Sequence, residues 1–172
     1  MKTYICQICG DAYLGTEKPS ECPFCGARAN FIKEGKDANP ITNQIETIGE
    51  VSKQNLQTTY DLETKAVAIY TCMANNAKSY EIKAMYKRLA KVELEHATIV
   101  TKLCGITPPT INAEACSLDD AENFQRTIEL EENATELYKK FAKEAEETNV
   151  RIFFTALAQV EADHIELIKN YL

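Results

Sequence analysis

Glutamate, tyrosine and histidine recur in this chain at one fixed spacing. The first set comprises Glu63, Tyr70, Glu93 and His96. Each member recurs 68 positions later (131 − 63 = 68), which gives a second set of Glu131, Tyr138, Glu161 and His164. The chain has 2 histidines, and both belong to these sets. Carboxylates and imidazoles together suit iron or manganese, so the repeat predicts a two-metal site made of its four glutamates and two histidines.

Helical geometry would bring the members of each set together. Residues seven or three positions apart share a face of an α-helix, as Glu63 and Tyr70 or Glu93 and His96 would. A buried carboxylate is strongly unfavourable unless it is neutralised, paired or bound to a metal. We therefore expect metal between these helices, because apolar residues recur at helical spacing around the first glutamate of each set: Leu56, Tyr60, Val67, Met73, Ala74 and Ala77, then Phe124, Ile128, Leu137, Phe141 and Ala145.

Two tyrosines, Tyr70 and Tyr138, accompany these candidate ligands. A hydroxyl group beside a metal site can hydrogen-bond a ligand carboxylate and so orient it. The alternative is an ordinary core tyrosine whose hydroxyl group has some other partner. We expect the first role, and we count both tyrosines among the candidate catalytic residues.

The hydrophobic pattern predicts four long helices, at residues 50–78, 81–104, 118–147 and 150–172. Gly105 should end the second helix, and Ser117 with Asp120 resembles a capping box at the start of the third. The 13 residues from 105 to 117 (117 − 105 + 1 = 13) could span about 43 Å when extended. A helix of about 29 residues has the same length. This crossover predicts a mainly α, ferritin-like four-helix bundle.

Residues 1–36 contain two Cys-x-x-Cys-Gly motifs, whose cysteines are Cys6, Cys9, Cys22 and Cys25. This spacing is a strong signal for a metal bound by four thiolates. The glycine after each second cysteine would supply the positive φ of a tight turn. A segment this short cannot form a sufficient core, so the metal should hold it folded. Zinc and iron both accept four thiolates, and the spacing does not separate them.

A short segment separates the four-cysteine module from the predicted helices. Residues 37–49 lack helical periodicity and contain Pro40, so they are expected to form a flexible linker to the bundle of residues 50–172. Cys72, Cys104 and Cys116 are left over as an odd set, and disulfides would be expected only in a secreted protein.

The formal net charge is −7 without a basic cluster, which argues against nucleic acid or membrane as a partner. With no apolar stretch typical of a signal peptide or a membrane span, we expect a soluble cytoplasmic protein.

A four-cysteine module and a duplicated Glu…Tyr…Glu-x-x-His bundle in one chain resemble the rubrerythrin family. The resemblance covers most of the chain, because the four cysteines match the rubredoxin motif and the repeated glutamates and histidines match the di-iron ligands. The module is N-terminal here, which is similar to the reverse rubrerythrins. The resemblance implies a rubredoxin-like module with one iron, zinc being the alternative, and a bundle with two irons.

The family resemblance also implies an activity. Rubrerythrins are non-haem iron peroxidases that reduce hydrogen peroxide to water and protect against oxidative stress. Their electrons pass through the rubredoxin-type centre from an external NAD(P)H-dependent rubredoxin reductase. We accordingly expect Glu93 and Glu161 to bridge the irons, with one histidine on each iron and two terminal ligands, Glu63 and Glu131.

Similar rubrerythrins form head-to-tail dimers, and we expect a head-to-tail homodimer here. A tether of about ten residues would let the module fold back along its own bundle only if it were nearly extended. Electrons are therefore expected to come from the module of another chain.

One departure from the family pattern leaves other activities open. Typical members carry an additional glutamate three residues after the third-helix ligand, where this chain has Ala134. A site without it also suits a ferroxidase or an oxygen reductase. A further alternative is a non-enzymatic iron-binding protein with a structural zinc ribbon.

Overall fold

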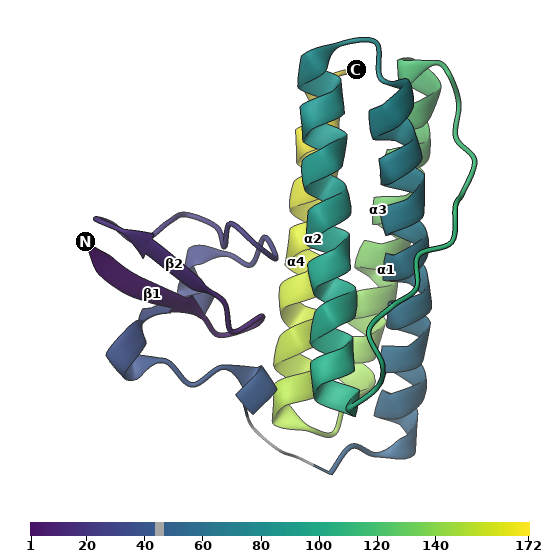
Figure 1. The fold of residues 1–172 in the computed structure, drawn as a ribbon. Coiled ribbons are helices and arrows are strands. Elements are labelled where there is room, and N and C mark those ends of the chain that lie inside the picture. Colours follow the sequence, from purple (N-terminus) through teal and green to yellow (C-terminus); the bar gives the residue numbers. More distant parts are fainter. Residues whose placement is uncertain (44–46) are drawn as a thin grey trace.

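The computed structural model describes residues 1–43 and 47–172, which form a small N-terminal sheet module and a long four-helix bundle (Figure 1). The protein is mainly helical, as predicted. Its helices are α1 (Glu50–Asn76), α2 (Tyr80–Cys104), α3 (Asp120–Glu144) and α4 (Thr148–Lys169). The predicted boundaries differ from these by at most three residues, for example 147 against 144 at the end of α3. Among the described residues, none of the helices is long and apolar enough to cross a membrane.

Polar caps and one glycine fix the helix ends. The Ser79 side chain accepts a hydrogen bond from the Ile82 amide at the start of α2. Gly105 ends α2 with a φ of +64°, a conformation that favours glycine, which confirms the predicted end. The predicted capping box at α3 is wrong, because Asp119 is the N-cap and accepts hydrogen bonds from the Ala121 and Glu122 amides. Ser117 lies two residues before this N-cap and instead accepts a hydrogen bond from the Asp119 amide.

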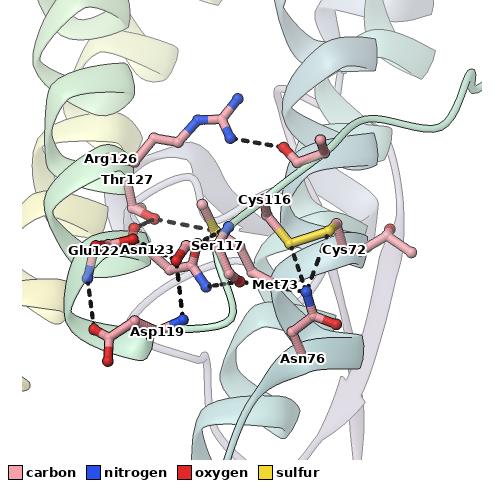
Figure 2. The surroundings of a disulfide bond; sticks show 12 residues. Cys72, Met73, Asn76, Cys116, Ser117, Asp119, Glu122, Asn123, Arg126 and Thr127 are labelled. Atoms are coloured by element: carbon pink, nitrogen blue, oxygen red, sulfur yellow. Dashed lines mark hydrogen bonds between the residues drawn. A yellow bond between two sulfur atoms is a disulfide. The ribbon is translucent and has the colours of Figure 1, made fainter.

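The crossover from α2 to α3 runs along the outside of α1 to the opposite end of the bundle (Figure 1). A disulfide joins Cys116, near its end, to Cys72 in α1 (Figure 2). Asn76 donates to the Ser117 carbonyl oxygen at 3.3 Å, and Arg126 donates to the Ala115 carbonyl oxygen at 2.7 Å. Two of the three left-over cysteines are therefore paired, contrary to the expectation for a protein that is not secreted.

The N-terminal module is built on a three-stranded antiparallel sheet of β1 (Lys2–Cys6), β2 (Ala12–Gly15) and β3 (Ile32–Glu34), with β1 in the centre. Three 3₁₀ turns follow or flank the last strand, η1 (Ala29–Phe31), η2 (Gly35–Asp37) and η3 (Ile41–Asn43). Ile41 is buried, and its amide donates to the Gln7 carbonyl oxygen at 2.8 Å. The first part of the expected flexible linker, up to residue 43, is thus packed on the module; residues 44–46 lie outside the described residues.

The module lies against α2 and α4 of its own bundle, near mid-height (Figure 1). Arg28 forms two hydrogen bonds with the Asp163 carboxylate, at 2.7 and 2.9 Å. Lys102 donates to the Cys9 carbonyl oxygen at 3.2 Å. Gly26 packs so closely on Val160 that a Cβ there would lie 2.8 Å from a valine methyl group. The module thus folds back onto its own bundle, the placement expected from the sequence only for a nearly extended tether.

Candidate metal centres

Six candidate ligands converge at the middle of the bundle, and all are buried, with at most 7 % of each residue exposed. Helices α1 and α3 each carry one of these glutamates, and helices α2 and α4 each carry one Glu-x-x-His pair, as the sequence spacing predicts. The three-residue step sets glutamate and histidine on one helix face, and the apolar stripe turns that face inward. The structure thus brings together all of the predicted bundle ligands.

Distances to the imidazole rings divide the four glutamates into two that lie near both rings and two that lie near one ring. The Nδ1 atom of His96 lies 3.0 Å from Glu93 and 3.3 Å from Glu161. The Nδ1 atom of His164 lies 3.0 Å from Glu161 and 3.3 Å from Glu93. These two glutamates therefore face both imidazoles and are placed to bridge two metal ions.

The other two carboxylates each face one imidazole. Glu63 lies 3.7 Å from Nδ1 of His96, and Glu131 lies 3.5 Å from Nδ1 of His164. The result is two overlapping groups of four ligands that share their bridging pair. Glu63 and Glu131 are thus placed as terminal ligands, the arrangement expected from the sequence.

Unpaired polar atoms at this centre test whether metal ions fit it. Both carboxylate oxygens of Glu93 and Glu161, and Nδ1 of both histidines, are buried without a hydrogen-bond partner among the described residues. Leaving that many buried polar atoms unpaired is highly unfavourable. Six such atoms aimed at one another are the donor set that two hard metal ions would satisfy, so the residues fit a two-metal site.

Burial changes the acidity of the carboxyl groups when no metal is bound. Burial and the neighbouring Glu161 carboxylate raise the pKa of Glu93 well above its usual range. The same two causes raise the pKa of Glu131 to about 7. Burial alone would raise the pKa of Glu161 too, but the two imidazoles beside it lower that pKa. Protons therefore compete with metal ions for these oxygens.

The two tyrosines each hydrogen-bond a terminal glutamate from the other repeat. The Tyr70 hydroxyl donates to Glu131, and the Tyr138 hydroxyl donates to Glu63, both at 2.5 Å. Burial, reinforced by these carboxylates, raises the pKa of both tyrosines well above its usual value. The hydroxyl groups therefore stay protonated and can orient one oxygen of each terminal ligand.

The four cysteines of the module form a second compact cluster. Their sulfur atoms all lie within 4.8 Å of one another, with two pairs at 3.7 Å. Thiolates at a tetrahedral metal with bonds of about 2.3 Å would be about 3.8 Å apart. Gly10 and Gly26 have φ values of +85° and +77°, and the Ile8 and Asp11 amides point at sulfur at 3.4 Å. The cluster fits a metal bound by four thiolates, with the glycine turns predicted from the sequence.

The two centres are linked by one hydrogen bond. The Nε2 atom of His96 lies 2.8 Å from the backbone carbonyl oxygen of Cys25. Because a carbonyl oxygen only accepts, Nε2 carries the proton and donates, which leaves the Nδ1 lone pair facing the carboxylates. One imidazole thus contacts a cysteine of the module through one nitrogen and the bundle centre through the other. No local sequence pattern predicts this contact, because the two residues are 71 positions apart.

A cavity of about 210 Å³ opens between α1 and α3 and reaches the carboxylates. The tyrosines and the four glutamates lie at its inner end, whereas the exposed Lys65 and Asn133 lie at its mouth. Its walls come from matching positions of the two repeats, which we call the apolar sleeve: Leu62, Ala66, Ile69, Leu130, Ala134 and Leu137. The sequence did not predict this cavity, since apolar residues near a core stripe do not reveal one.

Comparisons with known proteins agree with this geometry. A family model described as rubrerythrin matches residues 54–115. The chain is 31 % identical to reverse rubrerythrin-1 of Clostridium acetobutylicum, over 87 % of this chain and 83 % of that protein. It is 29 % identical to exoribonuclease 2 of Haemophilus influenzae, but over only 23 % of that protein.

Among solved structures, the manganese catalase KatB from Anabaena has the same bundle fold. The TM-score is 0.59 at 19 % identity, with 75 % of each chain covered. At this identity the match bears on the fold alone, and it agrees with the predicted ferritin-like bundle.

Proposed function

Because the chain belongs to the rubrerythrin family, we propose that it is a di-iron peroxidase that reduces hydrogen peroxide to water. The observation that carries the proposal is the set of unpaired buried ligand atoms at the bundle centre, in contact through His96 with the four-cysteine module. Family membership supports an oxidoreductase with a role in oxidative stress. The peroxide specificity is our inference.

The bundle residues would hold two iron ions, with Glu93 and Glu161 between them. A reduced di-iron centre supplies the two electrons that the reaction H₂O₂ + 2 e⁻ + 2 H⁺ → 2 H₂O requires. The protein's own task is then to hold the ligands, to admit peroxide and to supply protons. The hydroxyl groups of Tyr70 and Tyr138 lie at the inner end of the cavity, where each fixes a terminal glutamate.

We further propose that electrons reach the bundle from the four-cysteine centre of the same chain. The support is the contact between Cys25 and His96 and the docking of the module on its own α2 and α4. An iron ion in the four-cysteine site can change its charge by one electron, whereas zinc has no redox chemistry. An external NAD(P)H-dependent rubredoxin reductase is the proposed donor to this module.

Oxygen reduction or ferroxidase activity is the second candidate. The observation in its favour is the methyl group of Ala134 in the cavity wall, where the family pattern has an additional glutamate. A site with four carboxylates and two imidazoles has no feature of its own that excludes oxygen as the oxidant.

Rapid mixing of the fully reduced, iron-loaded protein with each oxidant tests the proposal. We expect hydrogen peroxide to oxidise the bundle centre at least tenfold faster than an equal concentration of oxygen. Faster oxidation by oxygen would assign the second activity instead. The visible spectrum of the same sample checks the module, because an iron–thiolate centre is coloured and a zinc centre is colourless.

A further inference from the structure

The apolar sleeve has a chemical character that hydrogen peroxide does not need. Hydrogen peroxide is a small, strongly hydrated molecule, and moving a polar molecule along apolar walls removes its hydrogen bonds to water without replacing them. The six sleeve side chains are all hydrocarbon, whereas the polar lining residues are either exposed, as Lys65 and Asn133 are, or belong to the buried carboxylate and tyrosine cluster. The lining therefore favours a molecule with one apolar part and one polar, reactive end.

The size of the cavity also exceeds what a diatomic or four-atom oxidant requires. An apolar cavity of about 150 Å³ is known to bind benzene, whereas this one measures about 210 Å³. Molecular oxygen, which is also apolar, would need only a narrow passage. The volume matches a branched alkyl or an aryl group with a peroxide group attached.

Two alanines keep this space open. Ala66 and Ala134 occupy equivalent positions on α1 and α3 and both line the cavity. Both are half-buried, and each lies three positions after a terminal ligand, Glu63 or Glu131. A longer side chain at either position would fill the space directly in front of the carboxylates.

We propose that small apolar organic hydroperoxides are substrates of this site, bound with the hydrocarbon group in the apolar sleeve and the peroxide group at the carboxylates. The inference rests on the proposed peroxidase function and adds its substrate class. The reaction is ROOH + 2 e⁻ + 2 H⁺ → ROH + H₂O, in which the O–O bond breaks and R stays on one oxygen. The two electrons come from the reduced metal centre of the proposed function. Each methylene group buried in the sleeve should increase affinity about fourfold.

The kinetic test compares cumene hydroperoxide with hydrogen peroxide in the iron-loaded protein. We expect kcat/KM for cumene hydroperoxide to equal or exceed that for hydrogen peroxide. Ala134→Leu should lower the ratio of the two kcat/KM values at least tenfold. Ala66→Leu, on the opposite wall, repeats the measurement if Ala134→Leu folds poorly. Ala121→Leu is the matched control, because Ala121 is exposed on the same helix far from the cavity lining, and it should leave the ratio unchanged.

A binding measurement separates this inference from the proposed function. The product alcohol, 2-phenyl-2-propanol, should bind the protein in saturation-transfer NMR, and Ala134→Leu should abolish the signal. Reduction of hydrogen peroxide without binding of the alcohol, and with a kcat/KM ratio below one-hundredth, would overturn the substrate class and leave the peroxidase intact. If neither peroxide oxidised the reduced protein, the peroxidase function and the substrate class would both fall, even with the alcohol bound.

Discussion

The Nε2 atom of His96 lies 2.8 Å from the carbonyl oxygen of Cys25, so a histidine of the bundle and a cysteine of the module share a hydrogen bond. The same histidine turns Nδ1 toward Glu93, at 3.0 Å. This single ring therefore contacts both the four-cysteine module and the carboxylates of the bundle centre.

Glu93→Ala should remove a bridging ligand and lower the metal content of the bundle from two ions toward one or none. The physical reason is that this carboxylate faces both imidazoles, so its loss affects both metal positions. Elemental analysis combined with the visible spectrum should show the four-cysteine centre unchanged. Glu132→Ala is the control, because Glu132 is an exposed neighbour of a ligand. Two bundle metals retained in Glu93→Ala would rule out the bridging role.

Tyr138→Phe should weaken metal binding in the bundle roughly 10- to 100-fold, the usual effect of losing a hydrogen bond to a ligand. The Tyr138 hydroxyl group donates a hydrogen bond to Glu63. Without this hydrogen bond, the Glu63 carboxylate would be less well oriented for metal binding. Competition with a chelator measures the change. Tyr86→Phe makes the same substitution at another buried tyrosine, whose hydroxyl pairs with Thr127 instead, and should leave the affinity unaltered.

Metal affinity of the bundle should rise with pH through about 7. The pKa of Glu131 is raised from 4.5 to about 7 in the metal-free fold, so at pH 6 a metal ion must displace its proton. Apparent affinity should increase about tenfold per pH unit for each proton displaced. Anaerobic titration with Fe²⁺ between pH 6 and 7.5 tests this, and a flat profile would contradict it.

The stability of the metal-free protein should change with pH in the opposite direction. The folded state holds the Glu131 proton up to about pH 7, whereas the unfolded chain releases it near 4.5. The contribution of protonated Glu131 to the free energy of unfolding is therefore complete below pH 4.5 and is lost as the pH rises through 7. Urea unfolding of the metal-free protein at pH 5.5 and 7.5 would measure the loss.

Electron transfer within one chain predicts the result of mixing two inactive variants. Cys9→Ser lacks the donor centre, and Glu93→Ala lacks an intact acceptor. When the two are unfolded and refolded together, peroxidase activity dependent on the reductase should not reappear, since neither chain has both centres. Recovered activity would show that the module of one chain serves the bundle of another, as a head-to-tail homodimer would allow. That homodimer remains a prediction from the sequence.

Cys116→Ser should destabilise the protein by about 4 kcal/mol, because the disulfide to Cys72 closes a loop with a sequence separation of 44. Urea unfolding should give the same lower value for the wild-type chain under reducing conditions. Cys104→Ser is the control, since Cys104 is outside any disulfide in the described part of the chain. An unchanged midpoint in Cys116→Ser would mean that the hydrogen bonds around Ser117 alone hold the crossover.

Features that depend on short spacings or on the 68-residue repeat could be predicted from the sequence, and contacts between other distant segments could not. The three-residue step between Glu93 and His96 and the two Cys-x-x-Cys-Gly motifs are local, so helix and turn geometry alone place them. The capping prediction failed by two residues because Ser117, Asp119 and Asp120 all have side chains that can cap a helix.

The docking of the module could not be predicted, because it depends on surface complementarity between distant segments. Gly26 was expected to serve a metal turn, and its second role, close contact with Val160, has no sequence signature. The Arg28–Asp163 pair joins residues 135 positions apart. The Cys72–Cys116 disulfide could not be predicted either, because cysteine spacing alone does not determine which cysteines pair.

The docked module makes the two halves of a duplicated site unequal. His96 is fully buried beneath Cys25, whereas the His164 side chain is 9 % exposed and has no such carbonyl partner among the residues described. The two positions should therefore fill in order when metal is scarce, with one distinct step in a titration for each. A chain with two copies of one helix pair therefore has unequal metal positions, one next to the proposed electron donor and one farther from it.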